Sequence, residues 1–142
     1  MGLDMYLEKR DKNARQLINE ETGKSYYEWE NVAYWRKANE IHKWFLDYYN
    51  LDYDFNCELQ EVSKEALQEL VDTCKFVLGR KGKNDEKFVA ESKLPTQGGF
   101  FFGGTDYDEY YYGHLESTID QLEKVIRETD WENEIVCYEC WW

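Results

Sequence analysis

Proline, histidine and long apolar runs are scarce in this chain, and basic residues are outnumbered by acidic ones. It has 142 residues with one proline and two histidines. A chain of that length with a single proline fits one domain, which would bury roughly 70% of the surface that the unfolded chain exposes. We therefore expect residues 1–142 to form a single domain around one core.

No apolar run approaches the roughly 20 residues that a membrane-spanning helix needs. The first residues, MGLDMYLEKRDK, have neither the basic nor the apolar region of a secretion signal. The sequence therefore predicts a cytoplasmic protein without membrane contact.

The 17 basic residues face 30 acidic ones, which gives a formal net charge of -13. This charge opposes approach to a nucleic-acid backbone or an anionic membrane, so we expect no direct nucleic-acid binding. Two interpretations remain: plain solubility, or an acidic surface that docks on a basic partner and mimics nucleic acid. The acids are spread along the chain, and this favours solubility.

Four cysteines are present, and Cys137 and Cys140 form a C-x-x-C motif. Such a pair can belong to a zinc knuckle or a redox site. Their setting, IVCYECWW, predicts a strand, which would place the two thiols on opposite faces. We therefore expect reduced cysteines without a metal. The sequence also lacks a nucleotide fingerprint and a nucleophile triad, so no cofactor is predicted.

Aromatic residues, in contrast, are abundant: there are twelve tyrosines, six tryptophans and seven phenylalanines. The stretch 94–112, LPTQGGFFFGGTDYDEYYY, joins four glycines, seven Phe or Tyr residues and three acids. Glycine pairs let the backbone turn or approach another surface closely, and the rings supply stiff contact area. This stretch predicts a binding wall; the alternative is a set of half-buried rings that bridge core and solvent.

Alternating or periodic apolar positions predict the elements of the first half. Residues 3–8 alternate as a strand inside the sheet, and residues 10–24 form a charged excursion with a helical turn at 15–19. A helix is predicted over 32–49, with a buried stripe at helical spacing. A strand over 57–62 follows. The stripe consists of Tyr34, Ala38, Ile41, Phe45 and Tyr49.

In the second half, Ser63 is a good N-cap for a helix that Gly79 ends. Residues 80–93 are expected to form a charged surface loop, and residues 93–102 a glycine-interrupted strand. Asp106 and Glu109 resemble a capping box for another helix, and residues 135–142 predict a strand that pairs beside the first. The apolar stripe of that helix is Leu115, Ile119, Leu122, Val125 and Ile126.

Together these elements predict an α+β fold: a mixed or antiparallel sheet of about four strands, with about three amphipathic helices against one face.

Three motifs carry a resemblance: MGLDMYL at the start, YWRKANEIHKWF after it, and LPTQGGFFFGGTDYDEYYY. With them the chain resembles a family of small, functionally uncharacterised proteins common in phages and prophages. The resemblance implies surface insertions at 10–25 and 80–93. It also implies a phage accessory protein in the host cytoplasm, for which countering host defence is one role.

The predicted first helix brings Arg36, Asn39 and Lys43 together, with His42 beside Trp35. A cation, an amide and an imidazole near an indole can hold a phosphate and stack a base. The alternative is a solvated helix face with a satisfied histidine.

A glycine pair and Thr105 precede a helix start, where backbone N–H groups attract anions, but Asp106 and Asp108 would repel a phosphate. The same acids with His42 or His114 could supply general acid and base groups or bind magnesium. Acids in a first helical turn are also explained by capping.

We therefore expect a binding protein and not an enzyme. It would inhibit a host protein, or alternatively sequester a nucleotide-derived signal or other small anionic ligand; a small Asp/His hydrolase is a third hypothesis, and a homodimer would also use an aromatic face. The candidate ligand- or partner-binding residues are Trp35, Arg36, Asn39, His42, Gln97, Phe101, Phe102, Thr105, Asp106, Tyr107, Asp108 and Tyr110.

Overall fold

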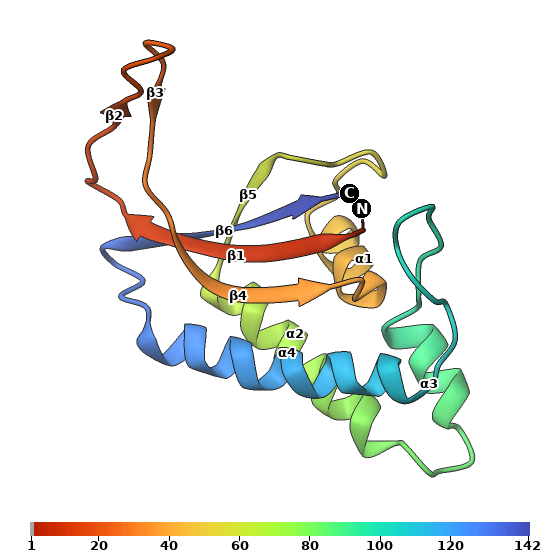
Figure 1. Ribbon diagram of the computed structural model, residues 1–142. Helices are drawn as coiled ribbons and strands as arrows, with labels where there is room; N and C mark the ends of the chain where they lie inside the picture. The colour runs from red at the N-terminus through yellow and green to blue at the C-terminus, as the bar shows by residue number, and fades with distance from the viewer. Residues whose placement is uncertain (1) are drawn as a thin grey trace.

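A computed structural model describes residues 2–142 as an α+β fold with a four-stranded antiparallel sheet, a separate two-stranded hairpin and four helices (Figure 1). The order in the large sheet is β4-β1-β6-β5. The strands are β1 (Asp4–Asp11), β2 (Leu17–Ile18), β3 (Ser25–Tyr26), β4 (Glu30–Arg36), β5 (Leu59–Val62) and β6 (Glu134–Trp141), and the helices are α1 (Asn39–Tyr48), α2 (Lys64–Gly79), α3 (Glu86–Lys93) and α4 (Glu109–Glu128).

The two ends of the chain form the centre of the sheet. β1 lies between β4 and β6, as the alternation predicts, and the side chains of its residues Met5 and Leu7 are buried. β6 pairs antiparallel with β1, so the predicted partnership of the first and last strands is confirmed. Val136 and Tyr138 point to the same side and complete the floor of the core.

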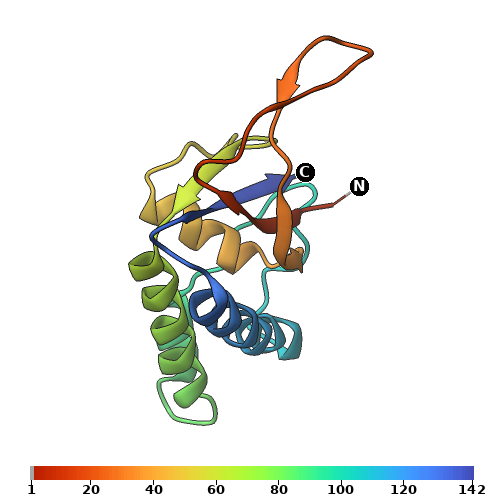
Figure 2. The ribbon, with the colours of Figure 1, turned by 90° about the vertical axis from the view of Figure 1, so that its left-hand side faces the viewer.

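The helices cover one face of this sheet (Figure 2). Ser63 caps α2 by accepting a hydrogen bond from the N–H of Ala66, as predicted. The cap of α4 is Asp108 and not Asp106: its carboxylate accepts from the N–H of Tyr111, because the helix begins at Glu109. Its apolar stripe packs toward the sheet, with Leu115, Leu122 and Val125 buried.

The helix predicted over 32–49 is wrong in its first third. Residues Glu30–Arg36 form the edge strand β4, in which Ala33 and Trp35 are buried while Tyr34 is exposed. Lys37 then takes a left-handed conformation, with φ of 57°, which no helix can continue through. α1 therefore starts at Asn39.

Three further expectations are corrected. Residues 86–93 form α3 instead of a loop, because Val89 and Ala90 are buried and supply an apolar anchor for one short helix. Residues 94–102 form no strand; their hydrogen bonds go to side chains such as those of Asn39 and Tyr111 and to single backbone groups such as the N–H of Leu3. Residues 15–19 form no helical turn and contain β2.

β2 and β3 form a hairpin that stands away from the sheet (Figure 2). None of the helices within residues 2–142 is both long enough and apolar enough to cross a membrane.

Candidate functional site

Residues 94–108, which we call the aromatic loop, connect α3 to α4 and pass the end of the sheet where β1 begins (Figure 1). The loop contains a tight turn in which the N–H of Phe102 donates to the carbonyl of Gly99 at 3.1 Å. Phe100 lies inside that turn and is 95% exposed, whereas Phe102 is only 1% exposed. The loop thus buries one ring and displays another.

The buried ring of Phe102 anchors the turn. It packs edge-on against His42 at 5.3 Å and against Trp142 at 5.4 Å between ring centroids. A Cβ at position 99 would lie 2.7 Å from the Phe102 ring, so only glycine fits there without displacing the anchor. Gly99 of this glycine pair therefore allows close approach.

Asn39 holds the loop from the start of α1. Its side-chain amide donates to the carbonyls of Phe102 at 2.9 Å and Gly104 at 2.8 Å. Its carbonyl oxygen accepts from the N–H of Gln97 at 2.9 Å. One side chain, 1% exposed, thus closes three backbone bonds across the loop.

Further hydrogen bonds support the aromatic loop, among them one from the Tyr53 hydroxyl to the carbonyl of Gly98. The N–H of Leu3 donates to the carbonyl of Phe101, and the hydroxyl of Tyr111 donates to the carbonyl of Leu94. Thr96 bonds twice within the loop: its N–H donates to the Tyr107 hydroxyl and its hydroxyl donates to the carbonyl of Thr105. Backbone groups with fixed partners give the loop one conformation.

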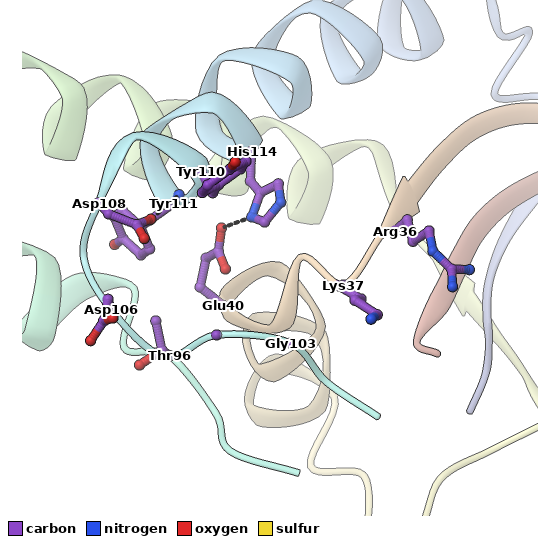
Figure 3. Close-up of a pocket in the computed structure, with 11 residues that line it drawn as sticks. Arg36, Lys37, Glu40, Thr96, Gly103, Asp106, Asp108, Tyr110, Tyr111 and His114 are labelled. Atoms are coloured by element: carbon purple, nitrogen blue, oxygen red, sulfur yellow. Dashed lines mark hydrogen bonds and ion pairs between the residues drawn. The ribbon is translucent and has the colours of Figure 1, made fainter. Parts of the chain in front are cut away.

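A pocket of about 340 Å³ lies between this loop and the starts of α1 and α4 (Figure 3). We call it the loop pocket. Its lining consists of Arg36, Lys37, Glu40, Thr96, Gly103, Gly104, Asp106, Asp108, Tyr110, Tyr111 and His114.

A buried carboxylate, Glu40, lies against the wall of the loop pocket. Glu40 is 2% exposed, and its Oε1 lies 2.8 Å from Nδ1 of His114 on α4. Within residues 2–142 its other oxygen, Oε2, has no hydrogen-bond partner, yet it is not fully enclosed by protein. A ligand in the pocket could therefore reach one carboxylate oxygen that has no hydrogen-bond partner among residues 2–142.

The charges at the rim of the pocket are unequal. Asp106 and Asp108 lie on one side and Lys37 on the other (Figure 3). Arg36 also lines the rim, but its guanidinium turns away from Glu40 and pairs with Asp4 at 2.9 Å. The acidic groups thus outnumber the cations that remain for a ligand.

Two predicted residues, Trp35 and His42, lie in the core and do not line the loop pocket. Trp35 is 3% exposed in β4, and its indole N–H donates to the hydroxyl of Thr118 at 2.9 Å. His42 is fully buried, with Nδ1 2.6 Å from the hydroxyl of Tyr138. Burial lowers the pKa of His42 to about 4, which keeps the imidazole neutral. Neither ring is open to a nucleotide base.

The other predicted residues divide between pocket and loop. Arg36, Asp106, Asp108 and Tyr110 line the loop pocket, and Tyr110 is 80% exposed. Asn39, at the start of α1, forms hydrogen bonds to the backbone of the aromatic loop. The remaining five lie within the loop itself: Gln97, Phe101, Phe102, Thr105 and Tyr107, of which Phe102 is buried.

Sequence reasoning missed Glu40 and Lys37. Both lie in the stretch YWRKANEIHKWF, but the helix predicted over 32–49 leaves no place for the turn at Lys37 between β4 and α1. Lys43, predicted to act with Arg36, instead pairs with Asp47 one helical turn away at 2.8 Å.

The cysteines have no place in this site. β6 is continuous, so Cys137 and Cys140 lie on opposite faces as predicted. Burial raises the pKa of Cys137 to about 11 and that of Cys140 to about 12, so both thiols stay protonated. Residues 2–142 contain no cluster of three His, Cys, Asp or Glu residues arranged for a metal ion.

Comparison of the chain with family models, curated proteins and solved structures found no match.

Proposed function

We propose that this chain is a phage accessory binding protein that docks the aromatic loop on a host protein and inhibits it, as a counter-defence protein would. One observation carries the proposal: Phe100 is 95% exposed at the tip of a loop whose backbone is fixed on both sides. The phage context comes from the resemblance of the three sequence motifs.

A displayed aromatic ring on a fixed loop suits protein recognition. Aromatic side chains are over-represented among the residues that dominate binding energy. A loop that is already ordered loses little conformational entropy on binding, so more of the contact energy appears as affinity. The hydrogen bonds of Asn39 and Thr96 provide that order before a partner arrives.

The charge of the molecule favours a basic partner. The net charge of -13 would accelerate association with a positively charged surface and suppress wrong partners. Asp106 in the aromatic loop and Glu109 at the start of α4 are both exposed, and they contribute negative charge close to Phe100 in the sequence.

The alternative of a captured anionic nucleotide has weaker support. Trp35 and His42 are buried, and the loop pocket presents Glu40, Asp106 and Asp108, which repel phosphate. Of the residues in the Asp/His hydrolase alternative, Asp106, Asp108 and His114 line the loop pocket, where the Glu40 carboxylate can orient the His114 imidazole. No serine or cysteine lines the pocket as a nucleophile.

The test compares capture of host protein from phage-infected cells by the wild-type protein, Phe100→Ala and Phe76→Ala. Phe76 is a matched control because its ring is 53% exposed on α2, outside the loop. We expect Phe100→Ala to weaken the partner complex by about 30-fold or more. We expect Phe76→Ala to leave it unchanged. Equal capture by both variants would contradict the proposal.

A further inference from the structure

We propose that the loop pocket accepts a cationic side chain of the partner, namely an arginine guanidinium, beside the point where Phe100 makes contact. This inference deepens the proposed function, since it names the chemistry of the partner at the same site. It rests on a buried carboxylate, on the shape of the pocket and on the balance of charges around it.

The first argument is the unsatisfied oxygen of Glu40. A carboxylate that is 2% exposed has lost most of its hydration, and His114 compensates only Oε1. A donor with a positive charge is the group that best compensates the second oxygen, since charge-assisted hydrogen bonds are roughly twice as strong as neutral ones. We therefore expect Oε2 of Glu40 to accept a hydrogen bond from a cationic N–H group.

The second argument is the shape of the pocket. A volume of about 340 Å³ is at the small end of ligand sites, where a side chain fits better than a nucleotide. Tyr110, which is 80% exposed, lines the pocket, and an aromatic face attracts a guanidinium group. Gly103 and Gly104 also line the pocket and add no side chains to it.

The third argument is the charge balance. Glu40, Asp106 and Asp108 line the pocket, Lys37 lies on the side opposite Asp106 and Asp108, and His114 is bonded to Glu40 (Figure 3). Asp4 already pairs with Arg36, so this guanidinium adds little positive charge to the pocket. The planar fork of a guanidinium can bond more than one acceptor at once, which a compact ammonium does less well.

The experiment uses the full chain with blocked arginine, N-acetyl-arginine methylamide, as probe. Its neutral urea counterpart, N-acetyl-citrulline methylamide, has nearly the same shape without the charge. Binding is followed by isothermal titration and by the NMR signals of the His114 imidazole and the Tyr111 amide. The lysine counterpart of the probe distinguishes a guanidinium site from a general site for cations.

We expect saturable binding of blocked arginine, with a dissociation constant in roughly the millimolar range for so small a probe. The wild-type protein should bind the citrulline probe at least about tenfold more weakly than blocked arginine. The Glu40→Gln variant should bind blocked arginine at least about tenfold more weakly than the wild type does. Asp106→Asn should also weaken it, whereas Asp120→Asn, an exposed acid farther along α4, should not. Tighter binding of the lysine probe would overturn the assignment to guanidinium.

Other outcomes would overturn the pocket altogether: no saturable binding by the wild-type protein, or equal binding of the citrulline probe. Should Glu40→Gln fail to fold, unchanged binding by Asp106→Asn overturns the proposal equally. Phe100→Ala should bind the probe like the wild type, because its ring does not line the pocket. Partner capture without probe binding would thus reject the pocket alone, and probe binding without a partner would reject the proposed function alone.

Discussion

At the scale of single residues, Asn39 connects the start of α1 to the aromatic loop. Its amide is buried, and every polar atom of that amide has a backbone partner in the loop. Amides can donate and accept at once, so no other side chain of this size meets all three partners. The order of the displayed loop therefore depends on this residue.

Replacing Asn39 with Ala should lower the free energy of unfolding by about 2 to 4 kcal/mol, since buried backbone groups lose their partners. Urea denaturation measures this loss. Amide hydrogen exchange should also accelerate at Gln97, whose N–H loses its acceptor. Asn13→Ala, at an exposed turn, is the control and should change stability by less than about 0.5 kcal/mol. Unchanged exchange at Gln97 would contradict the role of Asn39.

His42 makes the fold sensitive to acid. The folded protein keeps the imidazole neutral, because burial lowers its pKa from 6.5 to about 4. The unfolded chain takes up a proton below pH 6.5, while the folded protein does so only near pH 4. The contribution of His42 to stability is therefore fully present above pH 6.5 and is lost as the pH falls toward 4.

The loss across this interval should amount to about 3 kcal/mol. His42→Asn, which keeps a polar partner for the Tyr138 hydroxyl but cannot titrate, should show a flatter profile between pH 6.5 and 4 whatever its absolute stability. Denaturant melts at several pH values measure both profiles. Parallel profiles for the two proteins would show that another group causes the acid sensitivity.

At the scale of elements, the aromatic loop depends on backbone conformations that differ between neighbouring glycines. Gly103 has a φ of 83°, and a Cβ there would lie 3.0 Å from Cβ of Lys37. A Cβ at Gly104 would meet nothing within 4 Å. Alanine at these two adjacent positions therefore compares a strained backbone site, Gly103, with an unstrained one, Gly104.

Gly103→Ala should cost about 1 to 2 kcal/mol of stability, because an alanine disfavours this left-handed conformation. Gly104→Ala should change stability by less than about 0.5 kcal/mol. Thermal or urea unfolding of the two variants provides the comparison. Equal effects would mean that the turn does not fix the loop as described.

Some elements are predictable from local pattern alone. The alternation of Leu3, Met5 and Leu7 marks β1, and Ser63 followed by an apolar stripe marks α2. These signals succeed because each element buries one face, which leaves a period in the sequence.

The turn between β4 and α1 defeats the same reasoning. Ala38, Ile41 and Phe45 are truly on one helical face, and Tyr34 extends their spacing by coincidence. The left-handed backbone of Lys37 interrupts the helical spacing, and a lysine residue does not predict such a conformation.

The candidate site was predictable only in part. By composition, the glycines and rings of residues 94–112 predict a binding wall. The Glu40–His114 contact joins residues that are 74 positions apart, so no local spacing reveals it. Burial of His42 and Trp35 likewise depends on how α1 and β4 pack, not on their own sequence.

At the scale of the whole molecule, the fold concentrates the candidate site at one end of the sheet. The helices cover one face, and the aromatic loop passes the end of the sheet where β1 begins (Figure 1). Within that loop, Phe100 is 95% exposed. The acidic charge of the chain would steer a basic partner to it from a distance, and this attraction weakens as salt is added.

Native mass spectrometry of the protein purified from phage-infected host cells tests the central claim most directly, because partner, small ligand and oligomer mass are read together. We predict one stoichiometric host protein bound to the wild-type chain, lost in Phe100→Ala and without a nucleotide in the complex. A chain that carries a nucleotide and no protein, or only a homodimer that Phe100→Ala leaves intact, would contradict the account.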